Sequence, residues 1–335
     1  MIESSLDQSE PMLLPGRPAG RQVRSVIGYS LLTALMIVTP MLVFVPAALL
    51  HCAVRNGRRA AWAVLVLSLA MSSLYAVAVP EASSDAQKMA WSFLAAVALA
   101  VMLPAMAAIP LVERGEPFGR VLMFLIAGTL VGLAVTEAAS QLLLSFSPYA
   151  AQVAQTRELW HLVEQLYRDN KMPADVIRFA QQAGPVAVYF LPSQIIVSLA
   201  VVFTLSMMMY GRLRAWQNDP ARPYLLRNLV LPDWLLFVFV ACGLTPLVSG
   251  LLQKLAANVL FVVAFLYLLQ GLAVFRAMLL GIGAGVVGTL FGWAMLAITI
   301  PFSLLALAVT GLFDSFFDFR HFKKRKDDSH ESHSD

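Results

Sequence analysis

A few polar side chains interrupt the apolar stretches of this chain, and they are the residues that could do chemistry. Glu137 is the only acid well inside such a stretch, and Gln141 follows it one helical turn later. Gln194, Lys254 and Asn258 stand in later apolar stretches. An acid at the centre of a bilayer costs about 2.5–3.5 kcal/mol on insertion scales, so it normally faces protein or water and often marks a ligand path. The set predicts a polar ligand pocket that opens outward, with opposite charges on Glu137 and Lys254. The alternative is structural hydrogen bonding between helices.

Motifs for catalysis and for tightly bound cofactors are missing from the sequence. It contains no G-x-x-x-x-G-K-[ST] loop, no H-E-x-x-H, no G-x-S-x-G and no Cys-x-x-Cys, so it should not hydrolyse a nucleotide by itself. Cys52 and Cys242 are the only cysteines, which argues against a disulfide framework or a Cys metal cluster. Asp314 and Asp318 could hold Mg²⁺ in an enzyme acting on lipid, but beside Arg320 they are more typical of a solvated helix end. We therefore expect no catalytic residue, cofactor, metal or nucleic acid.

Glycines repeat at a spacing of four near the C-terminal end. Gly281 and Gly285 form one G-x-x-x-G pair, and Gly288 and Gly292 form another. This spacing places small residues on one helical face, where a second helix can approach closely, so we expect helix packing there. The overlapping G-x-G-x-x-G that starts at Gly283 has no strand before it and no acid about 20 positions later, so it does not indicate a dinucleotide site.

The polar residues and glycines named above must be positioned by helices formed from long runs without Asp, Glu, Lys or Arg. Crossing a hydrocarbon layer of about 30 Å takes roughly 20 apolar residues as helix. The chain is 59% hydrophobic and 13% charged, whereas soluble domains carry about 25% charge. Together these features predict an all-α fold, a polytopic transmembrane helical bundle. The charge-free runs are 25–54, 60–80, 89–112, 186–211, 234–253, 255–275 and 277–313, with a shorter one at 121–136.

The two longest runs, 25–54 and 277–313, are too long for one ordinary span. They contain Pro40, Pro46 and Pro301, and proline breaks a helix because it lacks the N–H donor. Each run is therefore a hairpin or a kinked single span. The hairpin interpretation is favoured, because it places most Lys and Arg on one side, as cytoplasmic loops require. It predicts about eight to ten membrane segments in a bacterial inner membrane, with both termini cytoplasmic.

The expected organisation is one transmembrane domain between two tails. Residues 1–24 and 321–335 are polar and are predicted to be disordered and cytoplasmic, and residues 25–320 form the membrane domain. An external amphipathic insertion spans about 145–185, with a helix over Tyr149–Asp169 and a second short helix after Pro173. The insertion is predicted to lie on the outer membrane surface, and the alternative is a lid over an outward-facing site.

Three stretches of the sequence together resemble a known family. They are Val45–Leu50 running into Arg55–Arg59, Ala257–Leu260 running on to Tyr267–Val274, and Gly311–Arg320. In this order they resemble the YybS-like family of predicted bacterial membrane proteins. That family is similar to the S components of energy-coupling-factor transporters, which capture a vitamin or metal in an outward-facing pocket. Those proteins depend on a separate coupling subunit and a pair of ATPases. The resemblance implies an S-component-like core and partner subunits that supply the ATPase.

Two functions follow as hypotheses. The first is a substrate-binding or transport-related subunit without its own ATPase, which takes a small-molecule ligand in the pocket described above. The second is a non-transporting membrane scaffold or assembly subunit. It would dock partner proteins through the basic loop Gly211–Asn228 or the glycine-rich face.

Overall fold

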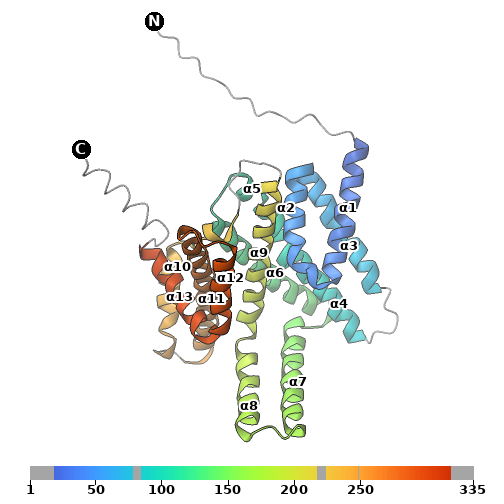
Figure 1. Cartoon of the computed structure of the whole chain (residues 1–335). Coiled ribbons are helices and arrows are strands. Elements are labelled where there is room, and N and C mark those ends of the chain that lie inside the picture. Colours follow the sequence, from blue (N-terminus) through green and yellow to red (C-terminus); the bar gives the residue numbers. More distant parts are fainter. Residues whose placement is uncertain (1–18, 78–83, 217–223, 248, 318–335) are drawn as a thin grey trace, which may run out of the picture.

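The computed structural model describes residues 19–77, 84–216, 224–247 and 249–317, and every regular element in these ranges is a helix (Figure 1). The predicted all-α polytopic bundle is confirmed. Five helices within the described residues are long and apolar enough to cross a membrane: Asp85–Glu113, Phe118–Leu144, Leu191–Ala215, Gly250–Gly281 and Ile300–Phe317. The shorter apolar helices are Val23–Val38, Pro40–Asn56, Trp234–Gly243 and Val286–Ile298.

The first long run folds back on itself. Helix α1 (Ala19–Val38) is followed by a 3-10 turn, η1 (Pro40–Phe44), and by α2 (Val45–Asn56). Asn56 Nδ2, at the end of α2, donates a hydrogen bond of 3.0 Å to the Ser25 hydroxyl near the start of α1. The two ends of the run therefore meet, as the hairpin interpretation requires. Because α1 begins at Ala19, the predicted tail 1–24 overlaps a helix, and its first 18 residues lie outside the described residues.

The next helices form the central bundle with α1 and α2. They are α3 (Arg58–Val77), α4 (Ser84–Ala96), the π-helical turn η2 (Val97–Met102), α5 (Leu103–Glu113) and α6 (Phe118–Leu144). The π turn shifts the hydrogen-bond register within one long span. The Thr129 hydroxyl of α6 donates to the Ala100 carbonyl at 2.7 Å, which satisfies an acceptor in the π turn.

Helices α7 (Pro148–Asp169) and α8 (Ala174–Tyr189) occupy the predicted external insertion. Figure 1 shows this pair projecting from one end of the bundle, side by side, with α8 continuing the direction of α9 (Leu191–Trp216). The predicted position on the outer membrane surface stays a prediction, and the pair extends away from the bundle (Figure 1). The reason is that α8 and α9 are nearly continuous, with a break of only one residue at Phe190.

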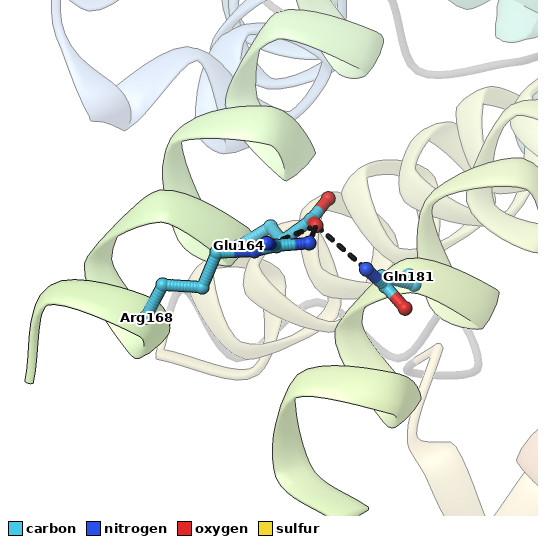
Figure 2. A network of polar contacts seen from close by, with 3 residues as sticks. All are labelled: Glu164, Arg168 and Gln181. Atoms are coloured by element: carbon cyan, nitrogen blue, oxygen red, sulfur yellow. Dashed lines mark hydrogen bonds and ion pairs between the residues drawn. The ribbon is translucent and has the colours of Figure 1, made fainter. Parts of the chain in front are cut away.

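A polar network joins the two helices of the projecting pair (Figure 2). The Glu164 carboxylate accepts hydrogen bonds from Gln181 Nε2 at 2.8 Å and from Arg168 Nε at 3.1 Å. Nearby, the backbone at Gly184 approaches the Trp160 side chain closely, because a methyl group at Gly184 would lie 3.2 Å from Trp160 Cβ. On the α7 side, the contact with α8 therefore combines the polar side chain of Glu164 with the large aromatic side chain of Trp160.

Acid should weaken this network. The hydrogen bond from Gln181 and then the one from Arg168 lower the pKa of Glu164 from its ordinary value of 4.5. A depressed pKa in the folded state means that the contribution is present above pH 4.5 and is lost as the pH falls through the lowered value. We expect faster amide hydrogen exchange in α7 below that pH. In Gln181→Ala the acid-induced change should begin at higher pH. An unchanged midpoint in that variant would contradict this assignment.

The C-terminal part packs as a second group of helices. It contains η3 (Leu226–Asn228), α10 (Trp234–Gly243), η4 (Thr245–Leu247), α11 (Gly250–Gly281), α12 (Val286–Ile298) and α13 (Ile300–Phe317). The second long run is broken at Gly283, where φ is +66°, and again at Thr299. Ser303 Oγ donates to the Leu296 carbonyl across the second break at 2.8 Å. Helix α13 packs mainly against α11.

Candidate functional site

Glu137 and Gln141 lie where α6 ends and the chain turns into α7. The Glu137 carboxylate accepts hydrogen bonds from Gln141 Nε2 at 2.7 Å, from the Ser147 hydroxyl and from the Tyr149 N–H at 3.1 Å. Ser147 is the N-cap of α7 and accepts from the Ala150 N–H at 3.0 Å. A carboxylate at a helix N-terminus satisfies free N–H groups and interacts favourably with the helix dipole. These contacts fasten the start of α7 to the end of α6.

Removing this carboxylate should loosen the first turn of α7. We expect Glu137→Ala to reduce local stability by about 1 kcal/mol, the usual effect of losing an N-terminal cap. Hydrogen exchange at the amides of Tyr149 and Ala150 measures it directly. Glu158→Ala, in the middle of the same helix, is the matched control and should leave these amides unchanged. Equal protection in both variants would show that Glu137 does not hold the helix.

Asn258 and Lys254 of α11 lie at the break between α8 and α9. Asn258 is buried, and its Oδ1 accepts from the Ser193 N–H at 3.2 Å, while its Nδ2 donates to the Tyr189 carbonyl at 3.2 Å. Lys254 Nζ lies 5.9 Å from the centroid of the Tyr189 ring, a cation–π arrangement. One amide side chain therefore satisfies backbone groups on both sides of the helix break.

Gln194 belongs to the same break, and its Nε2 donates to the Ala187 carbonyl at 3.4 Å. The structure thus groups Gln194 with Lys254 and Asn258, while Glu137 and Gln141 belong to the turn between α6 and α7. Among the described contacts, Glu137 binds the start of α7 and Lys254 faces an aromatic ring. No described contact joins Glu137 to Lys254, and the outward ligand pocket stays a prediction.

The glycines with the predicted spacing do not share one helix. Gly281 ends α11, and Gly285 precedes α12 as its N-cap. A methyl group at either position would meet nothing within 4 Å, and one at Gly288 would meet only the neighbouring Ala284 side chain. Gly292 alone contacts another helix, through the side chains of α11. The turn at Gly283 separates the two pairs, so the expected packing face is not formed among these residues.

Gly271 and Gly311 make a close contact between two helices. A methyl group at Gly271 of α11 would overlap the Leu307 carbonyl of α13, and one at Gly311 of α13 would overlap the Tyr267 carbonyl of α11. The backbones of α11 and α13 therefore touch at this point. Such close approach requires residues without a Cβ, as in other small-residue contacts between membrane helices.

A buried polar cluster lies beside these glycines. Gln270 is fully buried, and its Nε2 donates to the Asp314 carboxylate at 3.0 Å. Its Oε1 accepts from the Leu231 N–H at 3.1 Å, just before α10. Asp314 is only 6% exposed, so it is not the solvated helix end that its spacing from Asp318 suggested. Asp318 lies outside the described residues. The cluster ties α11 to α13 and to the segment before α10.

The end of α2 and the α5–α6 turn lie at the end of the bundle opposite the α7–α8 pair (Figure 1), and a groove opens between them. Its volume is about 1120 Å³, and it is lined by the end of α2, the α5–α6 turn, the end of α9 and residues 224–228. Both glutamates of its lining form ion pairs: Glu113 of α5 with Arg58 of α3, and Glu116 with Arg120 four residues later. Arg114 and Arg214 line the groove, further arginines lie at or near the ends of the helices that form it, and we call this region the arginine-rich end. Its members are Arg55, Arg58, Arg59, Arg114, Arg120, Arg212, Arg214 and Arg227.

Tyr224 and Arg214 form the inner wall of the groove. The Tyr224 hydroxyl donates to the Glu116 carbonyl at 3.2 Å, and burial, followed by the neighbouring Tyr210, raises the pKa of Tyr224 to about 12. The hydroxyl therefore stays a donor at physiological pH. Arg214 Nη1 donates to the Tyr210 hydroxyl at 3.0 Å, and its guanidinium lies over the same ring. A methyl group at Gly211 would collide with the Tyr224 backbone, which fixes the segment after α9 against that helix.

Sequence reasoning missed this groove, because its walls come from three regions far apart in the chain: 53–57, 112–118 and residues within 214–228. The available signal was the grouping of arginines in the gaps between apolar runs, which was used only to assign sidedness. The Gln270–Asp314 contact was also missed. In the sequence, Gln270 stands next to Gly271 inside an apolar run, and Asp314 follows Gly311 by three residues. These two polar residues, each close to a glycine, were the available signal for the contact.

Comparison with known proteins gives the family. A family model described as "Predicted membrane protein (DUF2232)" matches residues 26–315, which include nearly all described helices. No curated protein matches the chain, and no solved structure matches it. The chain therefore belongs to the DUF2232 family of predicted membrane proteins.

Proposed function

We propose that this integral membrane protein acts by docking an acidic segment of a partner protein in the groove at the arginine-rich end. The groove itself carries the proposal: about 1120 Å³ is open among helix ends, and its polar lining consists of Tyr224, Asn228, Arg114 and Arg214 together with Glu113 and Glu116. Arginine suits this role, because its planar guanidinium binds carboxylates through two parallel hydrogen bonds.

The charges around the groove support an acidic partner. Glu113 and Glu116 are engaged by Arg58 and Arg120. Arg114, in the groove wall, is exposed and forms no ion pair with another described residue. Positive charge that remains around a groove steers acidic partners and selects against basic ones. By the positive-inside rule, we infer that this arginine-rich end faces the cytoplasm of a bacterial cell.

A charge reversal at Arg114 tests the proposal. We expect Arg114→Glu to weaken binding of a fluorescent polyglutamate peptide to the purified protein about tenfold, equivalent to about 1.4 kcal/mol. Arg178→Glu makes the same change of charge on α8, at the other end of the molecule, and should alter the affinity less than about twofold. If both variants weakened peptide binding equally, the effect would come from the net charge of the protein. That result would contradict specific binding in the groove.

The transport-related subunit remains the second candidate. It is supported by the lack of a P-loop in the sequence, because such a subunit needs a separate ATPase, and the groove is a suitable place for that partner to dock. It differs from a scaffold in requiring a small-molecule ligand. Ligand-dependent thermal stabilisation across vitamins and metal ions, abolished by Asn258→Ala, would distinguish it from a scaffold.

A further inference from the structure

The arginine-rich end carries more positive charge than the glutamates of the groove balance. It has eight arginines, whereas the groove lining holds two glutamates, Glu113 and Glu116, and each of these already forms an ion pair with one arginine. Arg114 stands in the groove wall beside them. An excess of one sign of charge around a concave site raises the local concentration of segments with the opposite charge. The groove therefore suits an acidic segment from any source within reach.

The chain carries such a segment before its first helix. Residues 3–10 contain the acids Glu3, Asp7 and Glu10 and no Lys, Arg or His, and the first basic residue of the chain is Arg17. We call residues 3–10 the N-terminal acidic segment, and they lie outside the described residues. Their charge is opposite to the charge of the arginine-rich end, as electrostatic complementarity between two surfaces requires.

The start of α1 places this segment beside the groove. Asn56 Nδ2, at the end of α2, donates a hydrogen bond of 3.0 Å to the Ser25 hydroxyl of α1. Val54 and Gly57, on either side of Asn56, line the groove. Helix α1 begins at Ala19, six residues before Ser25, which is about 9 Å along a helix axis. Helix α1 therefore begins close to one wall of the groove (Figure 1).

The chain between the N-terminal acidic segment and α1 is long enough to reach that wall. Glu10 precedes Ala19 by nine residues, and an extended chain spans about 3.3–3.6 Å per residue, so the reach is about 30 Å. A segment joined to its site by a short linker has an effective concentration on the order of 1 mM. Even a weak affinity of the segment for the groove is then enough to fill it.

We propose that the N-terminal acidic segment occupies the groove of its own chain and that the partner protein must displace it. This inference rests on the proposed function of the groove and adds its regulation. A site that is free for only a fraction of the time shows an apparent affinity reduced by that fraction. The segment therefore screens the groove against weak acidic ligands and yields only to a partner that binds more tightly.

The C-terminal tail is a poorer occupant of the groove. Its acids, Asp327, Asp328, Glu331 and Asp335, follow a basic run at 323–326, so its charges cancel. The tail also leaves the described structure from α13, which packs mainly against α11 and contributes no residue to the groove lining. The N-terminal acidic segment has neither disadvantage.

Neutralising the segment should open the groove. In the full chain, the triple variant Glu3→Gln, Asp7→Asn and Glu10→Gln should bind the fluorescent polyglutamate peptide about fivefold more tightly, because the competing segment is lost. Three neutralised acids on the α7–α8 pair are the matched control, since they change the net charge of the protein by the same amount at the other end of the molecule. That control should alter the affinity less than about twofold. Its substitutions are Glu158→Gln, Asp169→Asn and Asp175→Asn.

The outcomes separate this inference from the proposed function. Unchanged binding in the triple variant, or equal tightening in the control, would overturn the inference, while weaker binding in Arg114→Glu would still support docking in the groove. In Arg114→Glu, neutralising the segment should have a smaller effect, because both ligands use the same arginine. An effect of full size in that background would show that the segment acts elsewhere, and this too would overturn the inference.

Intrachain photocrosslinking tests the contact without any partner or peptide. A photoreactive amino acid at Val54, in the groove wall, should link to residues 3–10 in the purified full chain, as mass spectrometry of the fragments measures. The link adds no mass of a second protein, and it should be lost in the triple variant. The same probe at Gln194, near the other end of the molecule, should not give it. No link from Val54 to the segment, or a link only between two isotopically distinguished chains, would overturn the proposal whatever the peptide does.

Discussion

Gly311→Ala should lower the free energy of unfolding of this protein more than any substitution of an exposed residue. A methyl group there overlaps the carbonyl oxygen of Tyr267 on the facing helix, and that oxygen belongs to the backbone. The clash can be relieved only if α13 moves away from α11, and this movement also strains the neighbouring hydrogen bond from Gln270 to Asp314. Overpacking of a tight contact costs about 1–3 kcal/mol and occasionally more, and we expect the upper part of that range. Thermal unfolding in detergent, followed by loss of the monodisperse species, measures it.

Gly281→Ala is the matched control on α11. A methyl group at Gly281 meets nothing within 4 Å, and alanine favours helix over glycine by about 1 kcal/mol. The expected effect is therefore neutral or slightly stabilising. If Gly281→Ala proved as damaging as Gly311→Ala, the predicted G-x-x-x-G face would be the important one, and the α11–α13 contact described here would not.

Gln270→Leu should cause the second large loss of stability. It removes the three hydrogen bonds of the amide, to Leu231, Asp314 and Ser315, which leaves the Leu231 N–H without its acceptor and the buried Asp314 carboxylate without one of its donors. A buried polar group that loses its partner costs about 1–3 kcal/mol, and more if it is charged, so we expect about 3 kcal/mol. The same thermal measurement applies.

Gln253→Leu makes the same substitution near the exposed start of α11 and is the matched control. It should change the melting temperature little, because Gln253 is exposed. A rescue experiment sharpens the test. Gln270→Leu combined with Asp314→Leu removes both polar partners and should recover part of the loss, because an apolar pair can replace a buried polar one. No recovery would mean that the Leu231 N–H carries the whole cost.

The fold class could be predicted from the sequence because each membrane helix corresponds to one continuous run of apolar residues. The runs 89–112 and 121–136 lie within the first two long spans, and the hairpin in residues 25–54 followed from proline and arginine positions. The positions of helix ends were harder. Nothing in the sequence distinguishes Gly283, which starts a turn with positive φ, from Gly281 and Gly285 beside it. The spacing rule assumed one continuous helix, and this turn invalidates it.

The candidate site was less predictable, because depth in the membrane does not determine which residues face each other. Glu137 and Lys254 are predicted to line one pocket, but the turn between α6 and α7 supplies the partners of Glu137, while the α8–α9 break supplies that of Lys254. Both partners are local features of helix ends. The groove at the arginine-rich end requires the relative placement of α2, α5, α6 and α9, which no pattern within a single segment contains.

Photocrosslinking from inside the groove tests the central proposal most directly. A photoreactive amino acid at Val54, which lines the groove and is 38% exposed, would be activated in intact membranes. We predict an adduct with an acidic segment of one protein, lost in Arg114→Glu and retained in Arg178→Glu. The same probe at Gln194, near the other end of the molecule, should not give this adduct. No adduct from Val54, or one that persists in Arg114→Glu, would contradict docking in the groove.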